Sequence, residues 1–186
     1  MVTKNDDAAL HTSIEVVAQG MDELLFNTSV GLHLTPMQVA QEIVRFMCED
    51  ATRKYKVTLG TDSMRLTGNA ADFVTAIVVH RVGRGGRYFW RRIELDNFHT
   101  MRDRITHEVI MSLEIATGFL TKLEEAKNAA TANVPHYDFE IHVDVGENGA
   151  TKAMIQELVG MVRAHNFEAR IKPESYAASN IADKHT

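Results

Sequence analysis

The chain has 186 residues, of which 45% are hydrophobic and 24% are charged, and its formal net charge at pH 7 is −5. This length and this balance are typical of one globular domain, and they exclude a disordered, collagenous or coiled-coil protein. Because the net charge is negative, the chain has no overall positive field for holding DNA or RNA, and any nucleic-acid contact must come from a local basic patch.

The cellular location is predicted from simple features of the sequence. No hydrophobic run approaches the roughly 20 residues that a membrane-spanning helix needs. The N-terminal segment MVTKNDDAAL lacks the basic-then-apolar layout of a secretory signal. The single cysteine, Cys48, excludes an internal disulfide and a multi-cysteine zinc site. We therefore expect a cytoplasmic protein.

Residues 1–53 are predicted to form an N-terminal helical extension. Apolar residues at helical spacing predict one helix over residues 12–26. A second helix over residues 35–53 begins with the capping-box pattern of Thr35 and Gln38 and continues as an apolar stripe. The stripe of the first helix either packs on the rest of the chain or is exposed, and in the second case it would indicate a homodimer.

Residues 54–186 are predicted to form the main domain, which starts with three strands. Alternating apolar residues predict a strand over 55–63, and a run rich in β-branched residues predicts a buried strand over 73–82. The GRGG turn leads into a third strand over 87–95. Because the connections are short, these three strands should form an antiparallel meander.

The second half of the main domain alternates helices and strands. A helix is predicted over about 100–133, a strand over 136–146, a helix over 150–166 and a short strand over 167–171, and a capped turn follows Ser179. A helical crossover of this length places the fourth strand parallel to one of the first three. The fold class is therefore mixed α/β, in a single globular unit.

Two aspartates lie close to the ends of predicted strands. Asp62 is in the segment GTDS and Asp144 in HVDVG. If the two strands are parallel neighbours, about 4.8 Å apart, the aspartates converge and their repulsion favours a divalent cation. Alternatively, each aspartate only caps its own turn.

Further acidic candidates come from the long helix and the C-terminus. The helical phase places Glu108 on the flank of the apolar stripe, close to the strand ends, and places Glu114 on the solvated side. Asp183 is a fourth candidate, and its alternative is an exposed charge near the C-terminus.

The segment 81–92 carries five arginines and no acidic residue, with three aromatic residues between them. Arginine with aromatic side chains suits phosphate contact and base stacking. The candidate nucleic-acid-binding residues are Arg84, Arg87, Arg91 and Arg92. The alternative is a solvated hairpin whose aromatic residues belong to the core.

Several segments resemble the YkuK-like family of ribonuclease H-like proteins: FNTSVGLHLTPMQVAQEIVRF, YKVTLGTDS, FVTAIVVHRVGRGGRYFWRR and the stretch from HVDVGENG to ADKHT. The resemblance implies a ribonuclease H-like fold, with a five-stranded mixed sheet ordered 3-2-1-4-5 and flanked by helices. It also implies an acidic cluster, which falls by position on Asp62, Glu108, Asp144 and Asp183. Met64 departs from the family motif GTDSQ, which has glutamine there.

Together with these acidic residues, the resemblance implies a nuclease that depends on a divalent metal. Two Mg²⁺ or Mn²⁺ ions held by the four acids would cleave phosphodiester bonds in RNA, an RNA–DNA hybrid or structured DNA. His142 and His185 are candidate proton shuttles, or they are structural. One alternative is a non-catalytic domain that binds nucleic acid or a protein partner. Another is a transposase-like triad of Asp62, Asp144 and Glu174.

Overall fold

The structure is a computed structural model, and it describes residues 20–147 and 151–176. The elements in chain order are α2 (Gly20–Glu23), β1 (Phe26–Thr28), β2 (His33–Leu34), α3 (Pro36–Cys48), β3 (Tyr55–Arg65), β4 (Ala71–Arg81), β5 (Gly86–Leu95), α4 (Met101–Ala129), β6 (Tyr137–His142), the 3₁₀ helix η1 (Lys152–Met154), α5 (Ile155–Ala164) and β7 (Glu168–Arg170). Among these residues, no helix is both long and apolar enough to cross a membrane.

The sheet has seven strands in the order β2-β1-β5-β4-β3-β6-β7. Strand β4 is antiparallel to β3 and β5, whereas β6 is parallel to both β3 and β7. The five strands from β5 to β7 therefore follow the predicted order 3-2-1-4-5, and the predicted helical crossover between parallel strands is present. The predicted number of strands was wrong, because β1 and β2 extend the sheet beyond β5.

The two additional strands come from the segment predicted to be helical. Strand β1 pairs with β5 through Asn27 and Thr28, so it covers a sheet edge that would otherwise leave backbone groups unpaired. The turn to β2 contains Gly31 at φ +81°, and the backbone N–H of Leu32 donates to the Thr28 hydroxyl at 3.1 Å. Of the helix predicted over residues 12–26, only the part from Gly20 to Glu23 is helical among the described residues.

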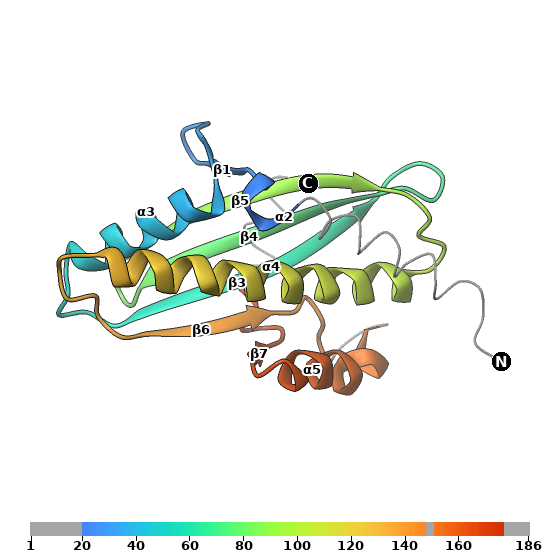
Figure 1. Ribbon diagram of the computed structural model, residues 1–186. Helices are drawn as coiled ribbons and strands as arrows, with labels where there is room; N and C mark the ends of the chain where they lie inside the picture. Colours follow the sequence, from blue (N-terminus) through green and yellow to red (C-terminus); the bar gives the residue numbers. More distant parts are fainter. Residues whose placement is uncertain (1–19, 148–150, 177–186) are drawn as a thin grey trace.

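Helices α3 and α4 lie side by side across one face of the sheet, and α5 lies beside the β6–β7 edge (Figure 1). The predicted capping box of α3 is present. The Thr35 hydroxyl accepts from the Gln38 N–H at 3.3 Å, and the Gln38 side chain accepts from the Thr35 N–H at 2.9 Å. The helix ends at Cys48, five residues before the predicted end at residue 53.

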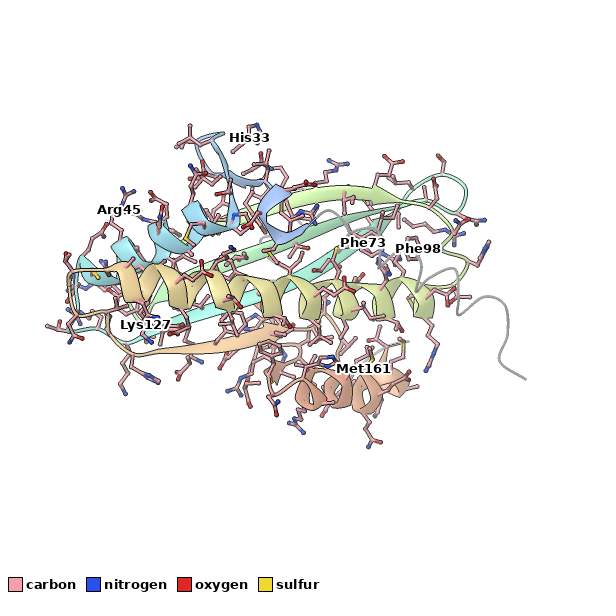
Figure 2. All side chains as sticks on the ribbon, in the orientation of Figure 1. His33, Arg45, Phe73, Phe98, Lys127 and Met161 are labelled. Atoms are coloured by element: carbon pink, nitrogen blue, oxygen red, sulfur yellow. The ribbon has the colours of Figure 1, made fainter. Side chains whose placement is uncertain are left out.

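Aromatic packing holds the first turns of α4 against the sheet. Figure 2 shows Phe73 of β4 and Phe98 next to one another beside this end of the helix. The ring of His107 lies 5.2 Å from both of these rings, and burial lowers its pKa to about 4. The neutral imidazole thus behaves as an aromatic core residue. This packing fixes the position of the next residue, Glu108.

Candidate functional site

The parallel pairing of β3 and β6 brings the two strand-end aspartates together. Gly60 of β3 is paired with His142 of β6. Asp62 lies two residues after Gly60 and Asp144 two residues after His142, and because the strands are parallel both steps run in the same direction. The condition under which the sequence predicted their convergence, adjacent parallel strands, is therefore met.

Asp62, Glu108 and Asp144 line one pocket of about 210 Å³. Its other lining residues are Ser63, Arg104, Ile105, Gly146, Thr151 and Lys172. Three acids from β3, α4 and the segment after β6 thus share a small polar pocket at the carboxyl ends of two strands. Asp183, the fourth acid of the prediction, lies outside the described residues.

Glu108 is buried, with 4% of its surface exposed. Its Oε1 accepts a hydrogen bond from the Ser63 hydroxyl at 2.5 Å. Burial raises the pKa of Glu108 to about 8, and the negative charges of Asp62 and Asp144 act in the same direction, against the Ser63 hydrogen bond and the positive charge of Arg104. In the metal-free protein this carboxyl group therefore carries a proton near neutral pH.

Glu114 differs from its prediction as a solvated residue. It is partly buried on α4, and burial raises its pKa to about 7. It is not among the residues that line the carboxylate pocket. The helical phase therefore separated Glu108 from Glu114 correctly with respect to the pocket, but it did not predict the degree of burial of Glu114.

Two cationic side chains reach into the same pocket. Lys172 Nζ lies 3.0 Å from Asp144 Oδ2. The guanidinium group of Arg104 donates to the backbone carbonyl of Ser63 and, at 3.0 Å, to its hydroxyl. Among the residues that the structure describes, the buried Asp144 Oδ1 has no hydrogen-bond partner, an arrangement that costs free energy unless a donor or a cation satisfies it.

The chemical type of the pocket's side chains suits a hard divalent cation, but their described positions do not surround one. Within residues 20–147 and 151–176, no group of three or more His, Cys, Asp or Glu side chains is placed to hold a metal ion. Ser63 holds one oxygen of Glu108 and Lys172 holds one oxygen of Asp144. The pocket nevertheless offers carboxylate oxygens, the ligands that Mg²⁺ and Mn²⁺ prefer, and no described residue donates a hydrogen bond to Asp144 Oδ1.

Two further candidates from the sequence, His142 and Glu174, do not line the pocket. His142 is buried, does not line the pocket, and has a pKa that burial lowers to about 4, so it is neutral at pH 7. This placement does not support its role as a proton shuttle. Glu174 pairs with Arg170 at 3.4 Å and does not line the pocket, so the transposase-like triad gains no support. His185 lies outside the described residues.

The four hairpin arginines predicted to bind nucleic acid have different surroundings. Arg84 lies in the exposed turn between β4 and β5. Arg91 is buried, with 8% of its surface exposed, and Arg92 forms an ion pair with the buried Asp72 at 2.7 Å. The buried Phe89 belongs to the core. The hairpin thus presents less free positive charge than its sequence suggests.

Arg87 is held by α3. Its guanidinium group lies 4.9 Å from the centre of the Phe46 ring and forms ion pairs with Glu42 at 3.2 Å and Glu49 at 2.8 Å. These contacts join β5 to the neighbouring helix and offset the arginine's charge. Arg87 therefore has a structural role that a pattern of arginines and aromatics does not reveal.

We expect Arg87→Met to lower the free energy of unfolding by about 1 kcal/mol, since it removes a cation–π contact and two partly exposed ion pairs. The matched control Arg84→Met, in the exposed turn, should change it by less than about 0.5 kcal/mol. Urea unfolding measures both. A variant at Arg87 that weakens nucleic-acid binding without loss of stability would contradict this interpretation.

Sequence reasoning did not select three residues that shape the pocket, namely Ser63, Arg104 and Lys172. Arg104 is four residues before Glu108 on α4, a spacing that puts both on one helix face. Lys172 comes two residues after β7, which is parallel to β6. These two sequence positions could therefore have identified Arg104 and Lys172 as neighbours of the predicted acidic residues.

Comparisons with known proteins agree with the fold. A family model described as "Ribonuclease H-like" matches residues 38–186. The chain is 31% identical over 170 residues to a protein of Bacillus subtilis (strain 168) named "Uncharacterized protein YkuK", and the alignment covers 89% of this chain and 98% of that protein. No solved structure is a significant match.

Proposed function

Because the chain belongs to the ribonuclease H-like family and is YkuK-like, we propose that it is a divalent-metal-dependent nuclease that hydrolyses phosphodiester bonds. The family supports a role that involves nucleic acid. The observation that carries the catalytic part is the convergence of Asp62, Glu108 and Asp144 on one small pocket at the carboxyl ends of two adjacent parallel strands. Asp183, which lies outside the described residues, is the fourth acid of the proposed set by its place in the sequence.

Asp62 and Asp144 would hold Mg²⁺ or Mn²⁺, with Glu108 as a third ligand. A bound divalent ion lowers the pKa of water and polarises a phosphoryl oxygen, the two requirements of phosphodiester hydrolysis. Ser63 fixes the orientation of the Glu108 carboxyl group, and Arg104 fixes Ser63. The chain thus supplies a carboxylate site whose orientation depends on contacts between β3 and α4.

Substrate phosphates would meet positive charge at the pocket itself. Arg104 and Lys172 both line it, and the side chain of Lys172 is 51% exposed. Arg87 and Arg92 of the hairpin are paired with acidic residues, as Lys172 is, but they do not line the pocket. We therefore propose that a nucleic-acid backbone approaches the strand ends, with the hairpin turn at Arg84 as a secondary contact.

A cleavage assay tests the proposed function. The full chain is incubated with labelled single-stranded RNA, an RNA–DNA hybrid and a four-way DNA junction, in Mn²⁺, in Mg²⁺ and in EDTA. We expect cleavage of at least one substrate with the divalent ion and none in EDTA. No cleavage of any of them in Mn²⁺ would contradict the proposal.

One observation favours a second function, a binding domain without catalysis. Lys172 and Arg104 already compensate the pocket, and no described group of side chains is arranged around an ion. In that case an electrophoretic mobility-shift assay would show that the protein binds nucleic acid both with and without EDTA, and that the nucleic acid stays uncleaved in both conditions.

A cytoplasmic location and a homodimer remain predictions. The apolar stripe predicted over residues 12–26 was the basis for the homodimer, and one of its residues, Met21, lies against Gly118 of α4.

A further inference from the structure

A backbone hydrogen bond places Lys172 at the edge of the carboxylate pocket. Its backbone N–H donates to the carbonyl of Val145 at 2.9 Å, which continues the parallel pairing beyond β6 and β7. Its side chain then passes Gly146, where an added Cβ would lie 3.3 Å from the Cβ and 3.7 Å from the Cδ of the lysine. Glycine at this position therefore leaves room for the side chain to reach Asp144.

The position of the Lys172 ammonium group limits the number of divalent ions that the pocket can bind. Lys172 Nζ is 3.0 Å from Asp144 Oδ2, the distance of a direct charge-assisted contact. Arg104 donates instead to Ser63, the residue that follows Asp62 in β3. A divalent ion on Asp144 Oδ2 would lie directly beside the ammonium group, and the two like charges would repel each other.

We propose that the ammonium group of Lys172 takes the place of a second divalent cation at Asp144, so that the pocket binds one divalent ion and not two. This inference rests on the proposed function. The sequence alone predicted two ions. That prediction considered only the acidic residues and did not include the positive charge of Lys172. Asp144 Oδ1 is buried and has no hydrogen-bond partner among the described residues, so this oxygen would bind the single ion.

In this arrangement Lys172 can also contact a phosphate group of the substrate. One side of its ammonium group contacts Asp144, while about half of the side chain is exposed. A phosphate oxygen can approach the exposed side, as it would approach a second metal ion. Lys172 is thus a positioning residue that supplies a fixed positive charge, and its contribution does not depend on the concentration of free metal.

Counting Mn²⁺ ions bound per chain tests the inference. The full chain, Lys172→Met, Lys172→Arg and the exposed control Lys152→Met are titrated with Mn²⁺, and free Mn²⁺ is measured by electron paramagnetic resonance. We expect one ion for the wild type, Lys172→Arg and Lys152→Met, and two for Lys172→Met. Two ions on the wild type, or one on Lys172→Met with unchanged affinity, would overturn the inference.

A metal-free experiment separates this inference from the proposed function. Melting temperatures are measured in EDTA for Lys172→Met, Asp144→Asn and the double variant. Because the two residues contact each other directly, the melting temperature of the double variant should fall by less than the sum of the decreases in the two single variants. Additive losses would overturn the role of Lys172 whether or not metal binds. If no variant binds Mn²⁺, the metal-dependent function and the inference fail together. Two ions on an active wild type would refute the inference alone.

Discussion

Replacing Asp62 by asparagine is expected to lower the rate of phosphodiester cleavage by about a hundredfold or more. Loss of a group that only orients a metal ligand typically costs about 10- to 100-fold in affinity or activity, so loss of a ligand itself should cost at least as much. Asp62 lies in β3, at the pocket that Glu108 and Asp144 share. Asparagine keeps the shape of the side chain and removes its charge.

The matched control for this variant is Asp138→Asn. Asp138 is an exposed residue of β6 in register with Lys56 of β3, so it lies on the same two strands but does not line the pocket. Its cleavage rate should equal that of the wild type. Melting temperatures measured in parallel show whether each variant is folded. A folded Asp62→Asn protein that cleaves within threefold of the wild-type rate would contradict the assignment of Asp62.

The second large effect concerns Glu108 and the pH dependence of stability. The pKa of Glu108 is about 8 in the folded chain, against an ordinary value of 4.5. Between these two pH values the folded state holds a proton that the unfolded state has released. The free energy of unfolding therefore falls as the pH rises from about 4.5 to about 8, and this loss is complete above pH 8.

Glu108→Gln removes this pH-dependent loss, because glutamine cannot ionise and resembles the protonated acid. In EDTA the variant should match the wild type near pH 4 and exceed its free energy of unfolding at pH 9, by on the order of a few kcal/mol. Urea unfolding at pH 4, 7 and 9 measures the difference. Glu114, His107 and His142 also titrate abnormally, but they are present in both proteins and cancel in the comparison.

An exposed residue of the same helix provides the control. Glu125 lies on the solvent-facing side of α4, and Glu125→Gln should leave the pH profile of stability as it is in the wild type. If Glu108→Gln and Glu125→Gln give the same profile, Glu108 is not the buried, protonated group described above. Its role as a ligand that loses its proton on binding a cation would then lose its physical basis.

The parts of the fold that follow from local periodicity could be predicted. Alternation over residues 55–63 and 136–146 located β3 and β6, although β6 ends at His142, and the long helix before β6 predicted a crossover to a parallel strand. The N-terminal hairpin could not be found in this way. Strands β1 and β2 have three and two residues, too few for alternation, and they form because β5 offers an open edge.

By itself, the sequence determined which acidic side chains could meet. The strand-end positions of Asp62 and Asp144 and the helical phase of Glu108 are local properties, set by the repeat of a strand or a helix. Only the tertiary structure decided how the charges are compensated, because an ion pair depends on distance in space. Lys172 lies 28 positions after Asp144, and Arg87 lies 45 positions after Glu42, yet each is in direct contact with its partner. Those contacts exist because the strand order places β7 beside β6, and because α3 packs beside the hairpin.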